Sequence, residues 1–253
     1  MRPATDNSKA YRFEDFTHEA YARLLALASR QYVFRGYDSF GPGERFVLWR
    51  HDLDFSIVDA LPLARIEAEA GVRASYFVHL HCDFYNPFDA RSLRAVAEIA
   101  ALGHDIGLHF DFVLAGVKDA VALAARVQQE AGFLQAQYGV PVRAFSFHNP
   151  TPEALAFDAQ SYGGLVNTYG AYFRTQVAYC SDSNGHWRHE RLEDVLARPA
   201  AGPLQVLTHP TWWTAQVMSP REKIERTVQH LGASILADYT ATLANHGRKD
   251  IDW

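Results

Sequence analysis

The chain alternates short apolar runs with longer segments of helical spacing, and this alternation is the strongest constraint on its fold. Four runs have the length and composition of buried strands: residues 45–49, 74–80, 105–110 and 142–147. Three segments between them have helical spacing: residues 57–71, 90–103 and 117–139. Parallel strands need a crossover of about a dozen residues, which these helices supply. The sequence therefore predicts an α/β fold built on a parallel sheet or barrel.

The second half of the chain continues this pattern less regularly. Strands are expected at residues 165–169, 176–183 and 204–210, and helices at residues 192–198 and 219–245. Both halves together give about six or seven strands, enough for a barrel that closes irregularly. No break in composition marks a linker, and 253 residues suit one α/β barrel. We therefore expect a single domain over residues 1–253.

Composition and charge exclude several classes of protein. The net charge is −5, with Lys and Arg scattered along the chain, so no nucleic acid partner is expected. The two cysteines, Cys82 and Cys180, are too few for a disulfide framework and have no zinc-type spacing. Residues 1–16 lack the apolar region of a signal peptide, and no run approaches the roughly 18 apolar residues of a membrane span. We expect a cytoplasmic protein without a membrane span.

Polar and ionisable residues collect at the carboxyl ends of the predicted strands. They are His51, Asp52, Asp54, His79, His81, His109, Asp111, His148, Asp182 and His209. In a parallel α/β architecture these ends lie on one face, so residues far apart in sequence meet at a common site. His51 is the exception, because on a regular strand it faces away from Asp52 and Asp54. The sequence therefore predicts a polar site at this face.

The chemistry of these residues points to a metal-assisted hydrolysis. Asp and His side chains are the ligands that Zn²⁺ and other divalent first-row metals take, with one position left open for water. A remaining Asp is suited to act as the general base toward that water, and a His to protonate the leaving group. We therefore expect a divalent metal, Zn²⁺ in the first instance, as the cofactor.

Two motifs resemble those of the polysaccharide deacetylase superfamily, also called the NodB-homology or family-four carbohydrate esterases. Segment "RHDLDFS", residues 50–56, is similar to the family's first motif, which implies Asp52 as the catalytic base and Asp54 as a metal ligand. Segment "GHDIGLHFD", residues 103–111, is similar to the second motif and implies His109 as a metal ligand and His104 as part of the structural frame. The family's fold is a distorted seven-stranded (β/α) barrel, and that is the fold the resemblance implies.

Three further segments extend the resemblance to residue 210. In "FSFHNP", residues 145–150, His148 stands where the family has an Arg that lines the site near the base. Segment "CSDSNGHW", residues 180–187, is similar to the fourth motif, with Trp187 as a pocket wall and Asp182 as a polar support. Segment "VLTHP", residues 206–210, resembles the fifth, with Leu207 flanking the acyl pocket and His209 as the general acid.

One position departs from the family pattern. The second metal-binding His of the family falls here on Val113, which cannot bind a metal. His148 is the preferred replacement because it ends the next strand and imidazole is a good ligand. Asp111 and His81 are the alternatives.

The resemblance implies hydrolysis of an N-acyl group, N-acetyl above all, from an amino sugar. Without a signal peptide, the substrate would be a small or nucleotide-linked or lipid-linked amino sugar made for a surface glycan such as a polysaccharide or O-antigen. Aromatic residues on the loops suit a sugar ring; of the adjacent Trp212 and Trp213 one must face away from the pocket, and Trp212 is the candidate wall.

The same residues also allow two other functions. A deformylase or another amidohydrolase on the same scaffold would use the same base and metal. A sugar-binding relative without catalysis is the second alternative, since the usual second metal His is absent. The joint presence of Asp52, Asp54, His109 and His209 argues against the binding protein, because binding needs neither an acid nor a base.

Overall fold

The computed structural model describes residues 7–41 and 43–252 of the chain, so residues 1–6 of the polar amino-terminal segment lie outside it. The strands of these described residues are β1 (Val33–Arg35), β2 (Phe46–Leu53), β3 (Ser75–His79), β4 (Asp105–Phe110), β5 (Val142–Phe147), β6 (Ser161–Tyr162), β7 (Leu165–Asn167), β8 (Ala178–Ser183), β9 (His186–Trp187) and β10 (Leu204–Thr208). The α-helices are α1 (His18–Ala28), α2 (Leu61–Glu69), α3 (Ala90–Ala101), α4 (Phe112–Ala115), α5 (Ala120–Tyr138), α6 (Pro152–Leu155), α7 (Ala171–Gln176), α8 (Leu192–Ala197) and α9 (Pro220–Asn245). Short 3₁₀ helices are η1 (Phe13–Phe16), η2 (Val58–Ala60) and η3 (Pro210–Trp212).

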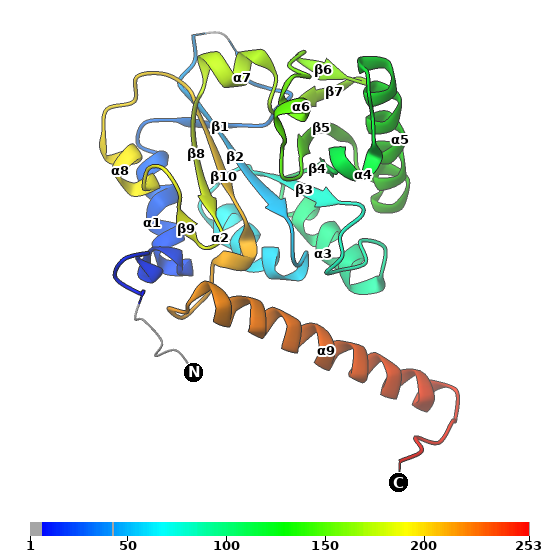
Figure 1. Ribbon diagram of the computed structural model, residues 1–253. Helices are drawn as coiled ribbons and strands as arrows, with labels where there is room; N and C mark the ends of the chain where they lie inside the picture. The colour runs from blue at the N-terminus through cyan, green and yellow to red at the C-terminus, as the bar shows by residue number, and fades with distance from the viewer. Residues whose placement is uncertain (1–6, 42, 253) are drawn as a thin grey trace.

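These strands form one sheet around which the helices lie (Figure 1). Seven neighbouring strands run parallel in the order β7-β5-β4-β3-β2-β10-β8, while β6 and β9 add antiparallel pairs at the two ends. The expected α/β fold built on seven neighbouring parallel strands is confirmed. The expected closure into a distorted barrel is not found among the described residues, where the sheet ends in an antiparallel pair on each side. The single domain stays a prediction.

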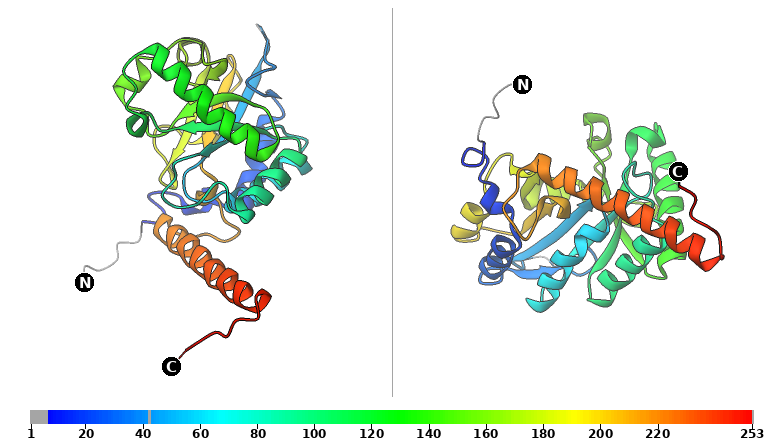
Figure 2. Two further views of the ribbon diagram at one scale, coloured as in Figure 1. Left: turned by 90° about the vertical axis from the view of Figure 1, so that its right-hand side faces the viewer. Right: turned by 90° about the horizontal axis from the view of Figure 1, so that it is seen from below.

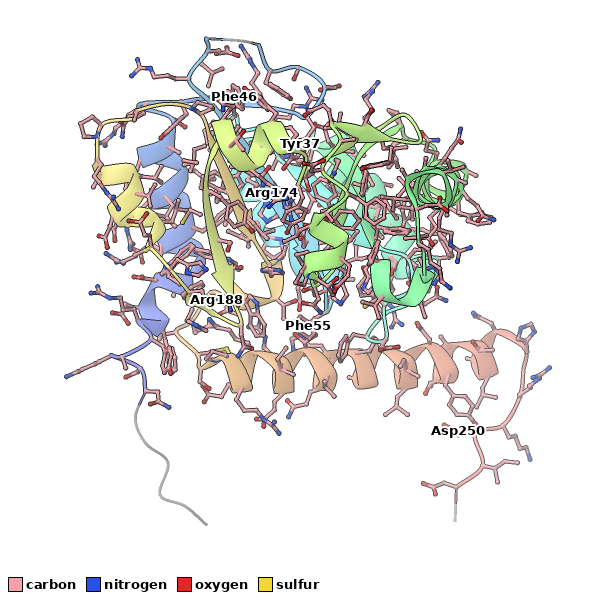
Figure 3. All side chains as sticks on the ribbon, turned by 45° about the horizontal axis from the view of Figure 1, so that its top comes forward. Tyr37, Phe46, Phe55, Arg174, Arg188 and Asp250 are labelled. Atoms are coloured by element: carbon pink, nitrogen blue, oxygen red, sulfur yellow. The ribbon has the colours of Figure 1, made fainter. Side chains whose placement is uncertain are left out.

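Apolar side chains close the amino-terminal end of the sheet and leave the carboxyl end free for polar groups. The main core lies between the strands and the helices, and a smaller cluster lies near the start of β2. Tyr37 and Phe46 belong to that smaller cluster and lie at the end of the molecule away from α9 (Figure 3). The carboxyl ends of the strands are therefore the open end.

Strand register aligns the polar residues at this open end. His79 of β3 is the register partner of His109 of β4, and His109 is in turn the partner of Ser146 of β5. Side chains at paired positions of parallel strands point to the same face of the sheet. Three neighbouring strands thus place His79, His109 and Ser146 in one row.

Helix α9 crosses the same end of the molecule and extends beyond the body (Figures 1 and 2). It begins with a capping box in which Ser219 and Glu222 satisfy each other's backbone groups. Lys223 is buried and donates from Nζ to the carbonyl oxygen of Trp212 at 2.7 Å, which fastens the helix to η3. No helix within residues 7–41 and 43–252 is both long and apolar enough to cross a membrane.

A buried polar network anchors α2 to the outer face of β2. Glu67 of α2 is fully buried and accepts hydrogen bonds from Tyr76 at 2.6 Å and from Tyr21, and its Oε1 lies 2.6 Å from Nε2 of His51. Burial alone would raise the pKa of Glu67, but His51, His104 and Tyr21 outweigh it and lower that pKa. His51 therefore belongs to the buried network that holds α2 against the sheet, and it faces away from Asp52 and Asp54 as its position on the strand predicted.

Replacing Glu67 by Ala should lower the free energy of unfolding by about 3–5 kcal/mol, because its buried partners would lose their acceptor. Urea denaturation followed by circular dichroism measures this. Glu69→Ala, an exposed change in the same helix, is the matched control and should cost less than about 1 kcal/mol. Equal costs for the two variants would contradict the role given to Glu67.

Candidate active site

A polar cavity of about 630 Å³ lies at the carboxyl ends of the strands. Eight of the residues lining it were predicted as site residues from the sequence: Asp52, Asp54, His109, His148, Asp182, Leu207, His209 and Trp212. Phe55 and Arg188 also line it and lie near the start of α9 (Figure 3). The volume lies within the range usual for small-molecule sites.

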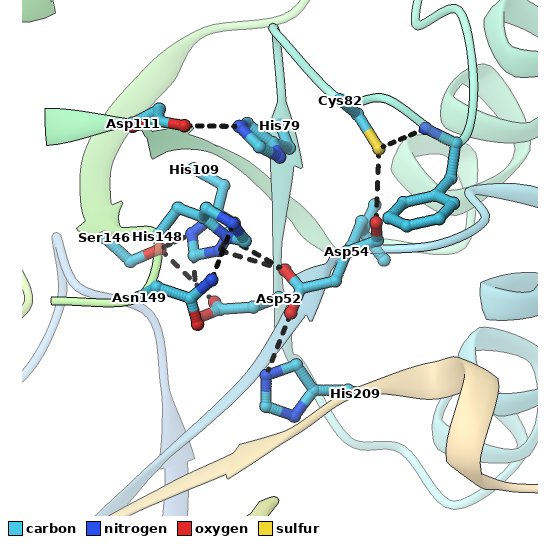
Figure 4. Close-up of polar contacts among 12 residues, drawn as sticks. Asp52, Asp54, His79, Cys82, His109, Asp111, Ser146, His148, Asn149 and His209 are labelled. Carbon is cyan, nitrogen blue, oxygen red and sulfur yellow. Dashed lines mark hydrogen bonds and ion pairs between the residues drawn. The ribbon is translucent and has the colours of Figure 1, made fainter. Parts of the chain in front are cut away.

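Three of the predicted metal ligands meet in this cavity (Figure 4). Asp54 Oδ1 lies 3.1 Å from Nε2 of His109 and 3.5 Å from Nδ1 of His148, and these two nitrogens are 3.1 Å apart. Each residue comes from a different strand end: β2, β4 and β5. The donor set of two imidazoles and one carboxylate suits Zn²⁺ or a similar divalent ion.

The hydrogen bond between His109 and Ser146 leaves Nε2 of His109 facing Asp54 and His148. Nδ1 of His109 lies 2.7 Å from Ser146 Oγ, and that hydroxyl donates to Asp52 Oδ1 at 3.3 Å. Ser146 therefore accepts from Nδ1–H, which leaves a lone pair on Nε2. Asp54 Oδ1 is buried and has no hydrogen bond of good geometry among the described residues. Asp54 Oδ1 and His109 Nε2 lie 3.1 Å apart and are both atoms that a cation binds, so the site fits a metal.

The Asp54 carboxylate is held in its charged form. Burial alone would raise its pKa, but the imidazoles of His109, His148 and His209 outweigh burial and hold the pKa well below the usual range. Burial lowers the pKa of His148, and the Asp54 carboxylate more than offsets this, so that this pKa is raised. The group therefore presents the anionic oxygen that a cation needs.

The other two candidates for the missing ligand lie outside this group. Nε2 of His81 lies 3.1 Å from Oε1 of Glu130. Asp111 caps α4 by accepting from the backbone N–H of Leu114 at 2.8 Å. Val113 lies on α4 and is 68% exposed, so it takes no part in the site. Among the three candidates, His148 is the residue that the fold brings to Asp54 and His109.

Asp52 is buried beside these ligands and is paired with an arginine. Arg50 Nη2 lies 2.8 Å from Asp52 Oδ2, and both side chains are almost fully buried. The same guanidinium donates to Thr168 at 2.7 Å and to Tyr169 at 3.1 Å. Arg50 was missed in the sequence, although alternation along a strand places residues 50 and 52 on one face. The pair fixes the orientation of the Asp52 carboxylate.

His209 forms a dyad with Asp182 across the cavity from β4. Its Nδ1 lies 2.5 Å from Asp182 Oδ1, while its Nε2 lies 3.6 Å from Asp54 Oδ2. Asp182 Oδ2 also accepts from Trp213 Nε1 at 3.1 Å. Burial lowers the pKa of His209, but the Asp182 carboxylate outweighs it and raises the pKa to about 9. The imidazole therefore carries its proton near neutral pH.

The structure places the predicted wall residues in two different regions. Leu207 and Trp212 line the cavity. Trp187 does not: its Nε1 donates to Asp15 at 3.1 Å, and its ring packs on Phe16. The prediction of Trp187 as a pocket wall is wrong, because the hairpin of β8 and β9 turns this side chain toward η1.

Comparisons with known proteins found similar solved structures. No protein-family model matches the sequence, and no curated protein matches it significantly. A mutant of a CE4 family pseudoenzyme, with restored enzymatic activity, aligns over 77% of this chain and 65% of its own, with 14% identity and a TM-score of 0.45. The deacetylase PplD of Streptococcus pyogenes, in complex with acetate, aligns over 83% and 86%, with 13% identity and a TM-score of 0.42. The chitin deacetylase of Colletotrichum lindemuthianum aligns over 73% and 81%, with 17% identity and a TM-score of 0.44.

All three similarities are distant, with identities of 17% or less and TM-scores below 0.5. The chain spans less than two thirds of the length of the pseudoenzyme mutant. At this level of identity the function has to come from the side chains of the chain itself.

In the metal-free protein, the imidazole of His209 should keep its proton up to about pH 9 and lose it as the pH rises through that value. Asp182→Asn keeps the shape but removes the charge, so it should move the titration to lower pH. Histidine NMR titration of both proteins measures the shift. An unchanged midpoint in Asp182→Asn would contradict the dyad.

Proposed function

We propose that this protein is a divalent-metal-dependent hydrolase that removes an N-acyl group, N-acetyl in the first instance, from an amino sugar. The observation that carries the proposal is the Asp54–His109–His148 group, with Asp52 and His209 each within 4 Å of one of these residues. A metal site, a carboxylate base and a charged imidazole acid in one cavity are the parts that amide hydrolysis requires.

Asp54, His109 and His148 would hold the metal. When bound, such an ion lowers the pKa of a water and polarises a carbonyl oxygen. Asp54 supplies the negative charge, and the hydrogen bond from His109 to Ser146 fixes the imidazole tautomer that the ion requires.

Asp52 is the proposed general base. Its Oδ2 accepts from Arg50 and its Oδ1 from Ser146, so both oxygens are held in place. The Arg50 guanidinium forms a charge-assisted hydrogen bond to the carboxylate that would take a proton from water. The carboxylate itself is the acceptor of that proton, and the bond to Ser146 keeps it next to His109.

His209 is the proposed general acid. Asp182 holds Nδ1–H, which leaves Nε2–H free to donate to the departing amine. A protonated imidazole beside the buried Asp52–Arg50 pair gives the site an acid and a base at one pH. This is the pairing that amide cleavage needs, because the amine is a poor leaving group without a proton.

The lining of the cavity suits a sugar substrate. Trp212 and Phe55 lie edge to face with ring centroids 5.4 Å apart, and Phe84 packs on Phe55 at 4.9 Å. Aromatic faces beside polar groups are the surface on which a pyranose ring stacks. Leu207 would flank the acyl group. We further propose Zn²⁺ as the metal and, as the substrate, a nucleotide-linked or lipid-linked amino sugar of surface glycan synthesis in the cytoplasm.

Asp52→Asn should lower amide hydrolysis of an acetylated amino sugar by about 10² to 10⁴-fold while leaving the metal bound. Asp54→Asn should lose both activity and metal, because it removes a charged ligand. Metal analysis and an acetate-release assay on the same samples separate the two roles. Asp83→Asn, in the wall of the same cavity, is the matched control and should keep both. Hydrolysis by Asp52→Asn at the wild-type rate would rule out Asp52 as the base.

A parallel assay of N-acetyl and N-formyl derivatives of one amino sugar identifies the acyl group. We expect the acetyl derivative to be hydrolysed faster. Faster release of formate would replace the proposal by a deformylase, and absence of both metal and hydrolysis would replace it by a sugar-binding protein.

A further inference from the structure

A second set of ligand atoms lies next to the Asp54–His109–His148 group. His79, Asp111 and His148 each offer one ligand atom, and these atoms lie within 4.8 Å of one another. His79 ends β3 and Asp111 follows β4, so the set uses strand ends that the proposed reaction leaves without a role (Figure 4).

The imidazole of His79 has a buried nitrogen without a hydrogen bond. The residue is 5% exposed, and its Nε2 has no hydrogen-bond partner among the described residues. Asp111 Oδ2 lies 3.8 Å from this nitrogen, which is too far for a hydrogen bond. An unmatched polar atom in such a position is costly, so its persistence indicates a partner of another kind.

The other two members of the set lie beside the His79 imidazole. The rings of His79 and His148 stack with centroids 4.4 Å apart and an interplanar angle of 29°, and each ring has a nitrogen within 4.8 Å of the other members' ligand atoms. Asp111 uses Oδ1 to cap α4, and its Oδ2 is the oxygen that lies on the same side as His79. Two imidazoles and a carboxylate again form the donor set of a divalent first-row metal.

We propose that His79, Asp111 and His148 form a second divalent-cation site, so that the cavity holds two ions at once. His148 lies between the two groups: its Nδ1 faces Asp54 and His109, and its Nε2 lies 2.9 Å from Asn149 Nδ2. An ion at each ring nitrogen would displace the Asn149 amide and release the ring proton to solvent, which leaves a bridging imidazolate. The second ion supplies the missing partner of His79 Nε2 and neutralises Asp111. This inference goes beyond the proposed reaction, because His79 and Asp111 have no role in that reaction and only His148 is shared with it.

The test is the zinc stoichiometry of the full-length chain after removal of metal with a chelator. Isothermal titration and metal analysis after desalting should give two ions per wild-type chain, each with a dissociation constant below about 1 μM. His79→Gln and Asp111→Asn should each bind one ion; Asn still caps α4, so Asp111→Asn keeps the fold. His109→Gln, which removes a ligand of the first group alone, should also bind one.

His81→Gln is the matched control, because His81 lines the same cavity but belongs to neither group. It should bind two ions. One ion per wild-type chain, or an unchanged stoichiometry in His79→Gln, would overturn the second site. Two bound ions without amide hydrolysis would overturn the proposed function and support the second site. Amide hydrolysis with one bound ion would support the proposed function and overturn the second site.

Discussion

Strand β2 buries ionisable side chains on both of its faces, and the need to match their charges governs the structure around it. A buried charge without a partner costs several kcal/mol. On one face Arg50 and Asp52 pair with each other, and on the other His51 meets Glu67 of α2. The first pair orients the proposed base, while the second anchors the helix layer to the sheet. One strand thereby connects the stability of the fold to the chemistry of the cavity.

The charged side chains of the cavity lie at different strand ends. Ser146 links the ring of His109 to Asp52, so the tautomer of a metal ligand and the orientation of the base depend on one hydroxyl. The Asp182–His209 pair holds a proton on the opposite side of Asp54 from His148. The Asp54 carboxylate therefore lies among three imidazoles. The proposed acid His209, the proposed metal ligand Asp54 and the proposed base Asp52 are three separate side chains.

Long buried strands and the convergence of their polar ends were predictable from the sequence, because periodicity and strand-end chemistry are local signals. Strands β4 and β5 were predicted to the residue, whereas β1, β6 and β9 are too short to show a period. Arg50 was missed although its alternation with Asp52 was visible. Trp187 was misplaced because the hairpin that turns it away is a tertiary feature, and the unmatched nitrogen of His79 is visible only in three dimensions.

The central claim is that Asp54, His109 and His148 together bind the catalytic metal. Anomalous diffraction from crystals of the zinc-loaded protein with acetate tests it most directly. The account predicts a zinc peak about 2.0–2.2 Å from a ligand atom of each of the three residues, with acetate beside Asp52 and Leu207. A cavity in which no zinc peak contacts both Asp54 and His109 would contradict it.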